Sequence, residues 1–386
     1  MNLVTLEKLL SLEGRAALAA GTALQPTDTR YPACVDRLRK RFPDDLARAA
    51  LDTVMLRQRA AAKYARAEEM VFTREGLEMA SGEVVANHRA KRFAGFGTVA
   101  DLCCGIGADS IGLALAGASV VSVDRDSLLL RMTEANLAVH GRTARFLLAD
   151  VLRDPLPECD AAFADPGRRP AGKRVLSLQH YEPPVAELLA RWPVGFPIGV
   201  KVAPGVPRIE LPSDVEAEFV SLNGELKECV LWYGPLRSAT LRATVLPSGH
   251  TLAIDGAPPM GNLQPIGSYL YDPDPSISRS GLTGRLANEL DAWVIDPEFA
   301  VLSSDELRPN AFATAYRVEA VLPYHVKRVG VWLREHSIGR VTIVKLGSRA
   351  DADELLPRWR NDGSEHRQVI LTRDEGNAVA VIAERV

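Results

Sequence analysis

The stretch Val99-Ala-Asp-Leu-Cys-Cys-Gly-Ile-Gly-Ala-Asp109 decides how this chain of 386 residues folds. An apolar run ends in Asp101, and a turn with glycines at 105 and 107 leads into a helical segment that starts near Ser110. Further along, the apolar run Ala118-Ser-Val-Val-Ser-Val123 ends in Asp124. This order predicts a βαβ unit, and an acid at the tip of its second strand is the arrangement that binds the ribose of an adenosine-type cofactor.

The same alternation continues to about residue 245. Short apolar strands that alternate with helices predict a parallel sheet covered on both faces, and therefore an α/β fold. Ligands bind to such sheets outside the carboxyl ends of the strands. The predicted strands are 98–103, 119–123, 144–148, 160–164, 197–202, 216–221 and 228–233, with helices at 108–117, 126–140 and 182–191.

Acidic residues follow three successive strands of this predicted sheet. Asp101 ends the first strand, Asp124 ends the second, and Asp150 follows the third in Phe146-Leu-Leu-Ala-Asp-Val151. A carboxylate with two acceptor oxygens matches the vicinal diol of a ribose, which favours Asp124 for that contact. Any one of these acids can instead cap a strand end, but three in succession favour a cofactor site.

The spacing D-x-C-x-G-x-G from Asp101 to Gly107 lacks the third glycine of the dinucleotide fingerprint. It resembles motif I of the class I S-adenosylmethionine-dependent methyltransferases, which implies a Rossmann-like seven-stranded sheet. The resemblance places Asp101 near the methionine ammonium of the cofactor and Asp150 near its adenine, with Gly105 and Gly107 letting the backbone approach. The predicted cofactor site consists of Asp101, Cys103, Gly105, Gly107, Asp109, Asp124, Arg125, Asp150 and Val151.

The fourth strand ends in Ala161-Ala-Phe-Ala-Asp-Pro-Gly-Arg-Arg169. Methyltransferases that act on exocyclic amines of nucleobases carry Asp/Asn-Pro-Pro-aromatic at this position, so the resemblance makes Asp165 and Pro166 catalytic candidates. Hydrogen bonds from the amine to the Asp165 carboxylate and the Pro166 carbonyl would aim the nitrogen lone pair at the methyl group. Gly167 and Arg168 replace the last two residues of that pattern.

Arg168 and Arg169 complete the predicted catalytic set, with two interpretations open. A guanidinium can stack on a base and contact phosphate, or the pair can clamp the carboxylate or phosphate of another substrate. Tyr181 is either the missing stacking ring or a core residue, and Lys201 is a further candidate for the cleft. Cys103 and Cys104 are favoured as small loop residues over nucleophiles, because no nearby His or Asn supports a thiolate.

Two groups within the methyltransferases share features with this chain. Residues 81–169 resemble the trimethylguanosine synthase and RNA guanine-N2 methyltransferase group, through the turn, Asp124, the helix end Asn136–His140 and the Asp-Pro pair. The chain also resembles bacterial class I methyltransferases with a C-terminal THUMP-like domain, through 323–327 and 341–345. The second resemblance implies RNA, tRNA or rRNA, as a partner.

Composition excludes several protein classes. The chain is 47% hydrophobic and 25% charged, with a formal net charge of −3, as in an ordinary globular protein. Five cysteines without regular pairing argue against a secreted disulfide framework, and no Cys or His spacing suggests a metal. Without a signal peptide or a long apolar run, we expect a cytoplasmic protein that does not enter the membrane.

Three domains are expected. Residues 1–95 form a helical domain, 96–250 the S-adenosylmethionine-binding domain, and 260–386 a small α/β THUMP-like module, separated by a proline- and glycine-rich stretch at 247–275. The last module is predicted to contain helices at 276–291 and 323–337 and strands at 293–295, 314–321, 341–346, 368–373 and 378–383. Between Arg30 and Arg92, fourteen Lys and Arg residues face nine Asp and Glu residues. This excess is typical of a solvated helix face, and a surface for backbone phosphates is the functional alternative.

The favoured hypothesis is therefore an S-adenosylmethionine-dependent methyltransferase that modifies a base nitrogen of tRNA or rRNA. The first alternative is a methyltransferase for an anionic small molecule or a protein, whose charge Arg168 and Arg169 would hold. The second alternative is a protein that binds the cofactor or RNA without turnover. Salt-sensitive RNA binding separates the first two, because phosphate contacts weaken steeply with ionic strength.

Overall fold

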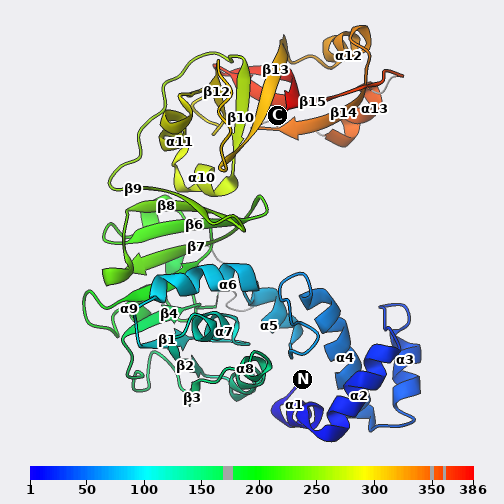
Figure 1. Cartoon of the computed structure of the whole chain (residues 1–386), viewed down its shortest axis with the longest axis vertical. Helices are drawn as coiled ribbons and strands as arrows, with labels where there is room; N and C mark the ends of the chain where they lie inside the picture. The colour runs from blue at the N-terminus through cyan, green and yellow to red at the C-terminus, as the bar shows by residue number, and fades with distance from the viewer. Residues whose placement is uncertain (168–176, 348–351, 360–361) are drawn as a thin grey trace. The chain divides into compact units, whose positions relative to one another are not determined.

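The computed structural model describes residues 1–167, 177–347, 352–359 and 362–386 (Figure 1). It divides into two compact units. The first consists of Met1–Val215 and Cys229–Ser238, and the second of Glu216–Glu228 and Ala239–Val386. No helix within the described ranges is long and apolar enough to cross a membrane.

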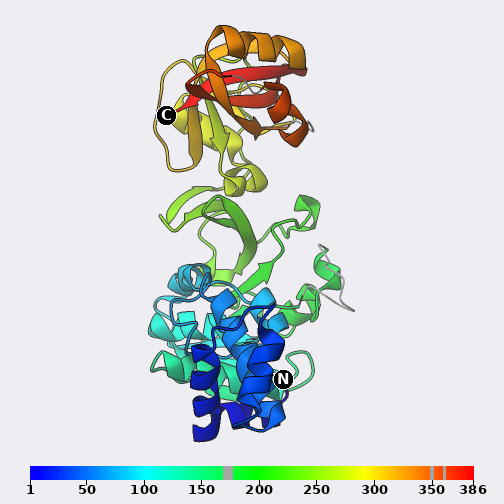
Figure 2. The ribbon, with the colours of Figure 1, turned by 90° about the vertical axis from the view of Figure 1, so that its right-hand side faces the viewer.

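The first unit begins with helices, as the sequence predicts, and Figure 2 shows the first four gathered into one bundle. Asn2 and Ser11 accept backbone N–H groups at the starts of the first two helices, which satisfies donors that a helix terminus leaves open. A separate apolar core that includes Leu18, Leu38 and Leu51 holds the bundle together. The helices are α1 (Leu3–Leu10), α2 (Leu12–Ala23), α3 (Tyr31–Leu38), α4 (Asp44–Ala60), α5 (Arg74–Met79) and α6 (Glu83–Ala90).

The sheet of the first unit has the strand order β3-β2-β1-β4-β5-β7. All neighbours are parallel except β5 and β7, so the carboxyl ends of the first five strands share one edge. Its elements are β1 (Thr98–Leu102), α7 (Ala108–Leu115), β2 (Ser119–Asp124), α8 (Ser127–Val139), β3 (Arg145–Leu148), β4 (Ala161–Ala164), α9 (Val185–Leu189), β5 (Ile198–Val202) and β7 (Glu225–Tyr233). These strands confirm the predicted α/β fold and reproduce the predicted strand positions to within a few residues.

Helices and sheet of the first unit share one apolar core. Met70 and Phe72, from the segment before α5, belong to the same buried cluster as Val99 of β1, Ile106 of the glycine turn and Phe163 of β4. Each of these five side chains is at most 2% exposed, so their burial stabilises the segment before α5 and the sheet together.

The second unit carries the strand predicted at 216–221 and others that the sequence analysis missed. β6 (Glu216–Leu222) pairs in parallel with β8 (Leu241–Leu246), which pairs with the antiparallel β9 (His250–Ile254). β9 and β10 (Tyr269–Pro273) lie inside the stretch 247–275 that the sequence analysis interpreted as loop. The expected helix 276–291 is two helices, α10 (Pro275–Ser280) and α11 (Thr283–Leu290), because Gly281 adopts a φ of 77° and ends the first.

The C-terminal sheet has the order β11-β12-β10-β13-β16-β15-β14. Its strands β13, β14, β15 and β16 and the helix α12 confirm elements expected from the sequence, whereas β10, β12 and α13 were not predicted. The remaining elements are β11 (Trp293–Val294), β12 (Leu302–Ser304), β13 (Ala313–Pro323), α12 (Val326–Glu335), β14 (Ile338–Lys345), α13 (Ala352–Trp359), β15 (Glu365–Asp374) and β16 (Asn377–Arg385).

Candidate active site

The carboxyl ends of β1, β2, β3 and β4, here called the acidic edge, carry the predicted acids. Register fixes this arrangement, because Leu102 lies beside Val123 of β2 on one side and Ala164 of β4 on the other. Asp124, in turn, lies beside Leu148 of β3. Residues that follow these strands therefore meet at one edge of the sheet.

The glycine turn leaves the acidic edge open where the chain passes from β1 to α7. Gly105 has a φ of 59°, and a Cβ built there would meet no atom within 4 Å, so the turn faces open space at this residue. Gly107 has a φ of 87°, and a Cβ there would lie 2.8 Å from Cγ2 of Thr133. Glycine at 107 thus allows α7 and α8 to pack closely, while Gly105 lets a ligand approach the backbone.

Asp101 is fully buried at the end of β1. The Ser110 hydroxyl donates to its Oδ2 at 2.6 Å, whereas its Oδ1 has no hydrogen-bond partner within the described part of the chain. Burial, followed by the nearby Asp109 carboxylate, raises the pKa of Asp101 well above its usual value. A buried acceptor without a partner is costly unless a ligand satisfies it, so Oδ1 fits a cationic donor such as an α-ammonium group.

Asp124 is held in a fixed orientation at the end of β2. Its Oδ2 accepts the Gly105 N–H at 2.9 Å and its Oδ1 accepts the Asp126 N–H at 3.0 Å. Burial raises the pKa of Asp124, and these backbone hydrogen bonds oppose that rise. Each carboxylate oxygen retains acceptor capacity, so the pair suits the two hydroxyls of a ribose.

Three other predicted cofactor residues lie beyond β2 and β3. Asp150 follows β3 by two residues, and its Oδ1 accepts the Leu152 N–H at 2.9 Å. Val151 is buried beside it. The exposed Arg125 donates to Glu182 at 2.8 Å, which draws the segment around Glu182 toward the acidic edge.

Asp109 has a partner that the sequence analysis did not assign. The Arg89 guanidinium of α6 donates to its Oδ1 from Nε at 3.0 Å, and both side chains are at least nine-tenths buried. The guanidinium also lies 5.0 Å from the centre of the Phe163 ring. Asp109 therefore fastens α7 to α6 through a charge-assisted bond, and its place in a cofactor site stays a prediction.

Asp165 is paired across the sheet with Lys201 of β5. Nζ of Lys201 lies 2.6 Å from Oδ2 of Asp165, and the Lys201 side chain is 5% exposed against 23% for Asp165. The backbone N–H of Asp165 donates to Leu102 at 3.2 Å, which keeps the Asp-Pro segment next to β1. The sequence analysis named Lys201 as a candidate for the cleft but did not predict its pairing with Asp165.

The structure describes only some of the remaining catalytic candidates. Pro166 directly follows Asp165, whereas Arg168 and Arg169 lie outside the described residues. Tyr181 is 2% exposed and its hydroxyl accepts the Ala203 N–H at 2.6 Å, so it is a packed residue and no free stacking ring.

The cysteines of the turn are unsuited to nucleophilic chemistry. Desolvation, followed by the carboxylates of Asp124 and Asp165, raises the pKa of the Cys103 thiol. Burial raises the pKa of Cys104 well above its usual value as well. Within the described ranges, no group of three His, Cys, Asp or Glu residues is placed to hold a metal ion.

Two relatives cover nearly the whole chain. Both are described as an uncharacterized S-adenosylmethionine-dependent methyltransferase, from the Mycobacterium tuberculosis strains CDC 1551 / Oshkosh and ATCC 25618 / H37Rv. Each is 33% identical over 347 residues, which are 87% of this chain and 95% of the relative. This chain is an S-adenosylmethionine-dependent methyltransferase.

Further comparisons found family matches at both ends of this methyltransferase and a solved structure with the same fold. Residues 313–385 match the THUMP domain-like family, and residues 2–60 match a domain of unknown function, DUF8688. A crystal structure of a putative methyltransferase from Porphyromonas gingivalis W83 superposes with a TM-score of 0.76 at 19% identity, covering 96% of this chain and 98% of that one. The predicted methyltransferase fold with a THUMP-like C-terminal domain is thereby confirmed.

The donor fits the acidic edge. When bound, S-adenosylmethionine supplies a methyl group on a positively charged sulfur. The partnerless Oδ1 of Asp101 would accept its ammonium group, and the fixed Asp124 carboxylate would accept its ribose hydroxyls. The open space beside Gly105 would let the ligand contact the backbone.

Proposed function

We propose that this methyltransferase modifies a base nitrogen of RNA, most plausibly tRNA or rRNA. The observation that carries this proposal is the Asp165-Pro166 pair at the end of β4, with the Asp165 carboxylate held at 2.6 Å by Lys201. The THUMP domain-like match at residues 313–385 supports RNA as the partner.

The geometry around Asp165 suits an amine acceptor. Lys201 occupies Oδ2, and the described residues offer no partner for Oδ1, which is therefore open to an N–H donor. The Pro166 carbonyl offers a second acceptor one residue on. An exocyclic amine that donates to both has its nitrogen lone pair turned away from these acceptors, and hence toward a methyl donor on the acidic edge.

Lys201 acts through Asp165. Its ammonium group fixes the carboxylate in one orientation and balances its charge in a largely buried setting. Methyl transfer is an in-line displacement, so the rate depends on how well the acceptor is positioned and how the vanishing sulfonium charge is compensated. As the methyl group moves, positive charge passes from sulfur to the acceptor nitrogen, which the Asp165 carboxylate would face; the donor leaves as S-adenosylhomocysteine and the nitrogen releases its extra proton to solvent.

The test is a nucleoside analysis. The purified protein is incubated with isotopically labelled S-adenosylmethionine and total RNA from a strain that lacks the gene, and the RNA is digested for mass spectrometry. We expect label in one modified nucleoside methylated at a base nitrogen, and none with Asp165→Ala. Label that enters small molecules or protein but never RNA would refute the proposal.

A further inference from the structure

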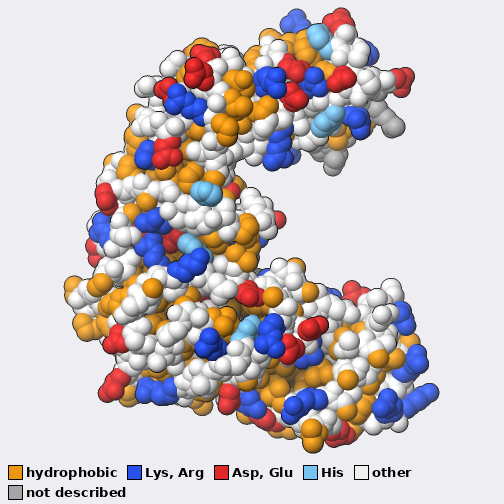
Figure 3. Space-filling view, viewed as in Figure 1, with side chains coloured by type: hydrophobic (Ala, Val, Ile, Leu, Met, Phe, Trp, Pro, Cys, Tyr) orange, Lys and Arg blue, Asp and Glu red, His pale blue; other side chains and the backbone are white. Residues whose placement is uncertain are grey.

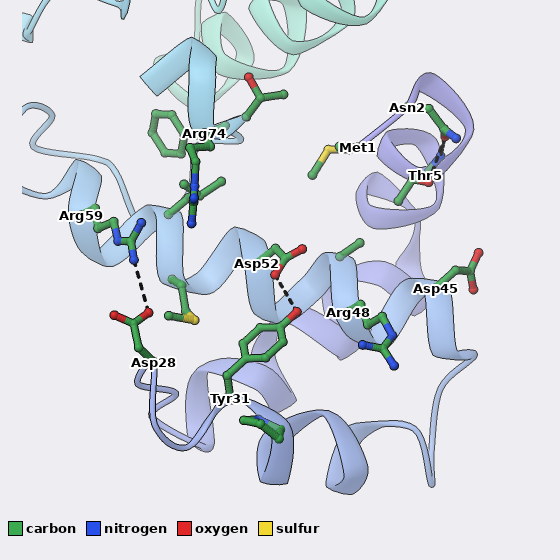
Figure 4. Close-up of a pocket in the computed structure, with 16 residues that line it drawn as sticks. Met1, Asn2, Thr5, Asp28, Tyr31, Asp45, Arg48, Asp52, Arg59 and Arg74 are labelled. Carbon is green, nitrogen blue, oxygen red and sulfur yellow. Dashed lines mark hydrogen bonds and ion pairs between the residues drawn. The ribbon is translucent and has the colours of Figure 1, made fainter. Parts of the chain in front are cut away.

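A large cavity lies in the N-terminal helical region, away from the glycine turn. It has a volume of about 940 Å³, within the range of small-molecule and cofactor sites. Figure 4 shows its walls, which come from the start of α1, the start of α3, one face of α4 and the segment before α5. We call it the N-terminal cavity. Most of it lies within the domain of unknown function matched at residues 2–60.

The acidic groups that line the N-terminal cavity all have partners. Asp28 pairs with Arg59 at 3.3 Å and Asp45 with Lys8 at 2.7 Å. Asp52 accepts the Tyr31 hydroxyl at 2.6 Å. Each carboxylate of the lining is thus already engaged, Asp28 and Asp45 by a cation and Asp52 by a neutral hydroxyl.

Arg74 has no such partner. The structure gives it no hydrogen bond or ion pair with any described residue, and in Figure 4 its guanidinium points into the cavity toward α4. The other lining arginines, Arg48 and Arg59, are paired with Asp44 and Asp28. The charge available to a ligand is therefore a single guanidinium, which suits a phosphate group.

The rest of the cavity lining is partly apolar and suits a flat ring of a ligand. Met55 and Leu56 are half-buried along α4, and Phe72 is buried behind them. Tyr31 stands half-buried with its hydroxyl bonded to Asp52, and burial and this bond raise the pKa of Tyr31 to about 12. An aromatic ring and a guanidinium without a partner among the described residues, both lining one cavity, offer a stacking surface for a base and a cation for its phosphate.

The cavity wall is connected to the glycine turn through one buried side chain. The Asn136 carbonyl accepts the Val71 N–H at 2.8 Å, and its amide donates to the Val71 and Ile106 carbonyls at 3.1 and 2.9 Å. On the same segment, a Cβ at Gly76 would lie 2.7 Å from Cγ2 of Ile106. The segment that forms one wall of the cavity therefore packs directly against the glycine turn.

We propose that the N-terminal cavity binds one nucleotide of the substrate RNA, with Arg74 on its phosphate and Tyr31 beside its base. The proposal rests on the proposed function and adds a second contact point for the same strand. A free mononucleotide has the same chemistry, and the experiment below separates the two sources.

The test measures binding of a fluorescently labelled single-stranded RNA 12-mer of mixed sequence to the full-length protein by anisotropy. We expect Arg74→Ala to weaken binding about tenfold and to lower the slope of log affinity against log salt by about one. Tyr31→Ala should weaken binding by a similar factor, about tenfold, through lost stacking. Arg15→Ala, an exposed arginine of α2 outside the cavity, is the matched control and should leave affinity and slope unchanged.

Folding is checked independently of RNA. Arg74 is exposed, so its variant should melt like the wild type and bind S-adenosylmethionine with unchanged affinity. Equal RNA affinity and salt slope in Arg74→Ala and Arg15→Ala would overturn the proposal, as would the absence of RNA binding by the wild type. Binding of 5′-AMP as tight as that of the 12-mer would identify free nucleotide and overturn the assignment to RNA.

Failure of this proposal and failure of the proposed function give different results. If Arg74→Ala methylates cellular RNA with the KM of the wild type, the cavity proposal is wrong and the function stands. If the variant binds RNA weakly but no cellular RNA accepts label from the wild type, the cavity proposal stands and the function is wrong.

Discussion

The acidic edge and the N-terminal cavity differ in the sign of the charge that each leaves uncompensated. At the acidic edge it is the Asp101 carboxylate, whose Oδ1 has no partner within the described part of the chain. In the N-terminal cavity it is the Arg74 guanidinium, while the aspartates around it are paired. The first site suits a cationic methyl donor and the second suits a phosphate, so the unpaired charge of each site indicates the charge of its ligand.

The two sites also differ in solvent exposure. Asp101 is fully buried, so its charge is unscreened and lowers stability when no ligand is bound. Arg74 is exposed, so its charge costs little and acts in competition with salt. The space-filling view in Figure 3 shows Lys and Arg side chains spread over the N-terminal helices, with acidic and apolar groups between them. Salt and solvent screen charges on such a surface. A ligand at the acidic edge should therefore also relieve a cost in stability, whereas at Arg74 there is little such cost to relieve.

The largest effect is expected for Asp165→Ala. Removing the acceptor carboxylate should lower kcat about 1000-fold, because positioning of the amine is lost. Stabilisation of the protein by S-adenosylmethionine in thermal melts should be nearly unchanged, since Asp165 lies on the acceptor side. If the variant were no longer stabilised by S-adenosylmethionine, Asp165 would belong to the donor site, and its assignment to the acceptor would be wrong.

Asp124→Ala should have the next largest effect. Without this carboxylate, two hydrogen bonds to the ribose are lost, and the affinity for S-adenosylmethionine should fall about 100-fold. Calorimetry gives the affinity, and the thermal shift on adding the donor should disappear. Asp126→Asn, which keeps the cap of α8, serves as the control. A thermal shift in Asp124→Ala equal to that of the wild type would contradict the ribose assignment.

Lys201→Met tests the positioning role of the lysine. The variant keeps the length of the side chain but leaves Oδ2 of Asp165 without its charged partner, so kcat should fall about tenfold. The KM for S-adenosylmethionine should not change. Lys201→Arg should restore part of the activity, because a guanidinium can reach the same carboxylate. Equal kcat in wild type and Lys201→Met would remove Lys201 from the mechanism.

The smallest effect concerns the stability cost of Asp101. Because the pKa of Asp101 in the folded protein lies above its ordinary value of 3.8, folding favours the protonated form, and stability is lost as pH rises from 3.8 through the raised pKa. Asp101→Asn removes this loss and should stabilise the ligand-free protein at pH 7.5, because the buried carboxylate is replaced by a neutral amide.

Urea unfolding at pH 7.5 and pH 4.5 measures this difference. The gain from Asp101→Asn should be smaller at pH 4.5 than at pH 7.5, because the raised pKa makes the wild-type carboxyl easier to protonate as the pH falls. The same variant should bind S-adenosylmethionine more weakly, because a neutral amide cannot balance an ammonium group. A gain that does not depend on pH would show that burial of charge at Asp101 is not its cause.

Local sequence patterns predicted the sheet and the donor. Apolar runs ending in acids located β1 to β4, and the spacing from Asp101 to Gly107 indicated the methyltransferase family that the relatives confirm. The individual site residues and the three-domain division stay predictions. Strands β9 and β10 were missed because the prolines and glycines that flank these short strands are typical of a loop.

Partners separated in sequence could not be predicted. Lys201 follows Asp165 by 36 residues, and only the pairing of β4 with β5 brings them together. Asp109 meets Arg89 because α6 packs on α7, and this contact has no local signature. The N-terminal cavity forms where four segments pack together, which no local pattern predicts. The sequence analysis noted only the excess of basic residues between Arg30 and Arg92.

The shared core of the first unit has a consequence for how this enzyme can be dissected. Phe72 and Met70 complete the packing around Val99 and Ile106, and Asn136 satisfies backbone groups of both segments. A truncated protein that starts after Phe72 would expose this apolar surface to water and leave a buried amide unsatisfied. The segment that carries Met70 and Phe72 therefore cannot be removed or exchanged without the sheet, and it should denature in the same transition as the methyltransferase sheet.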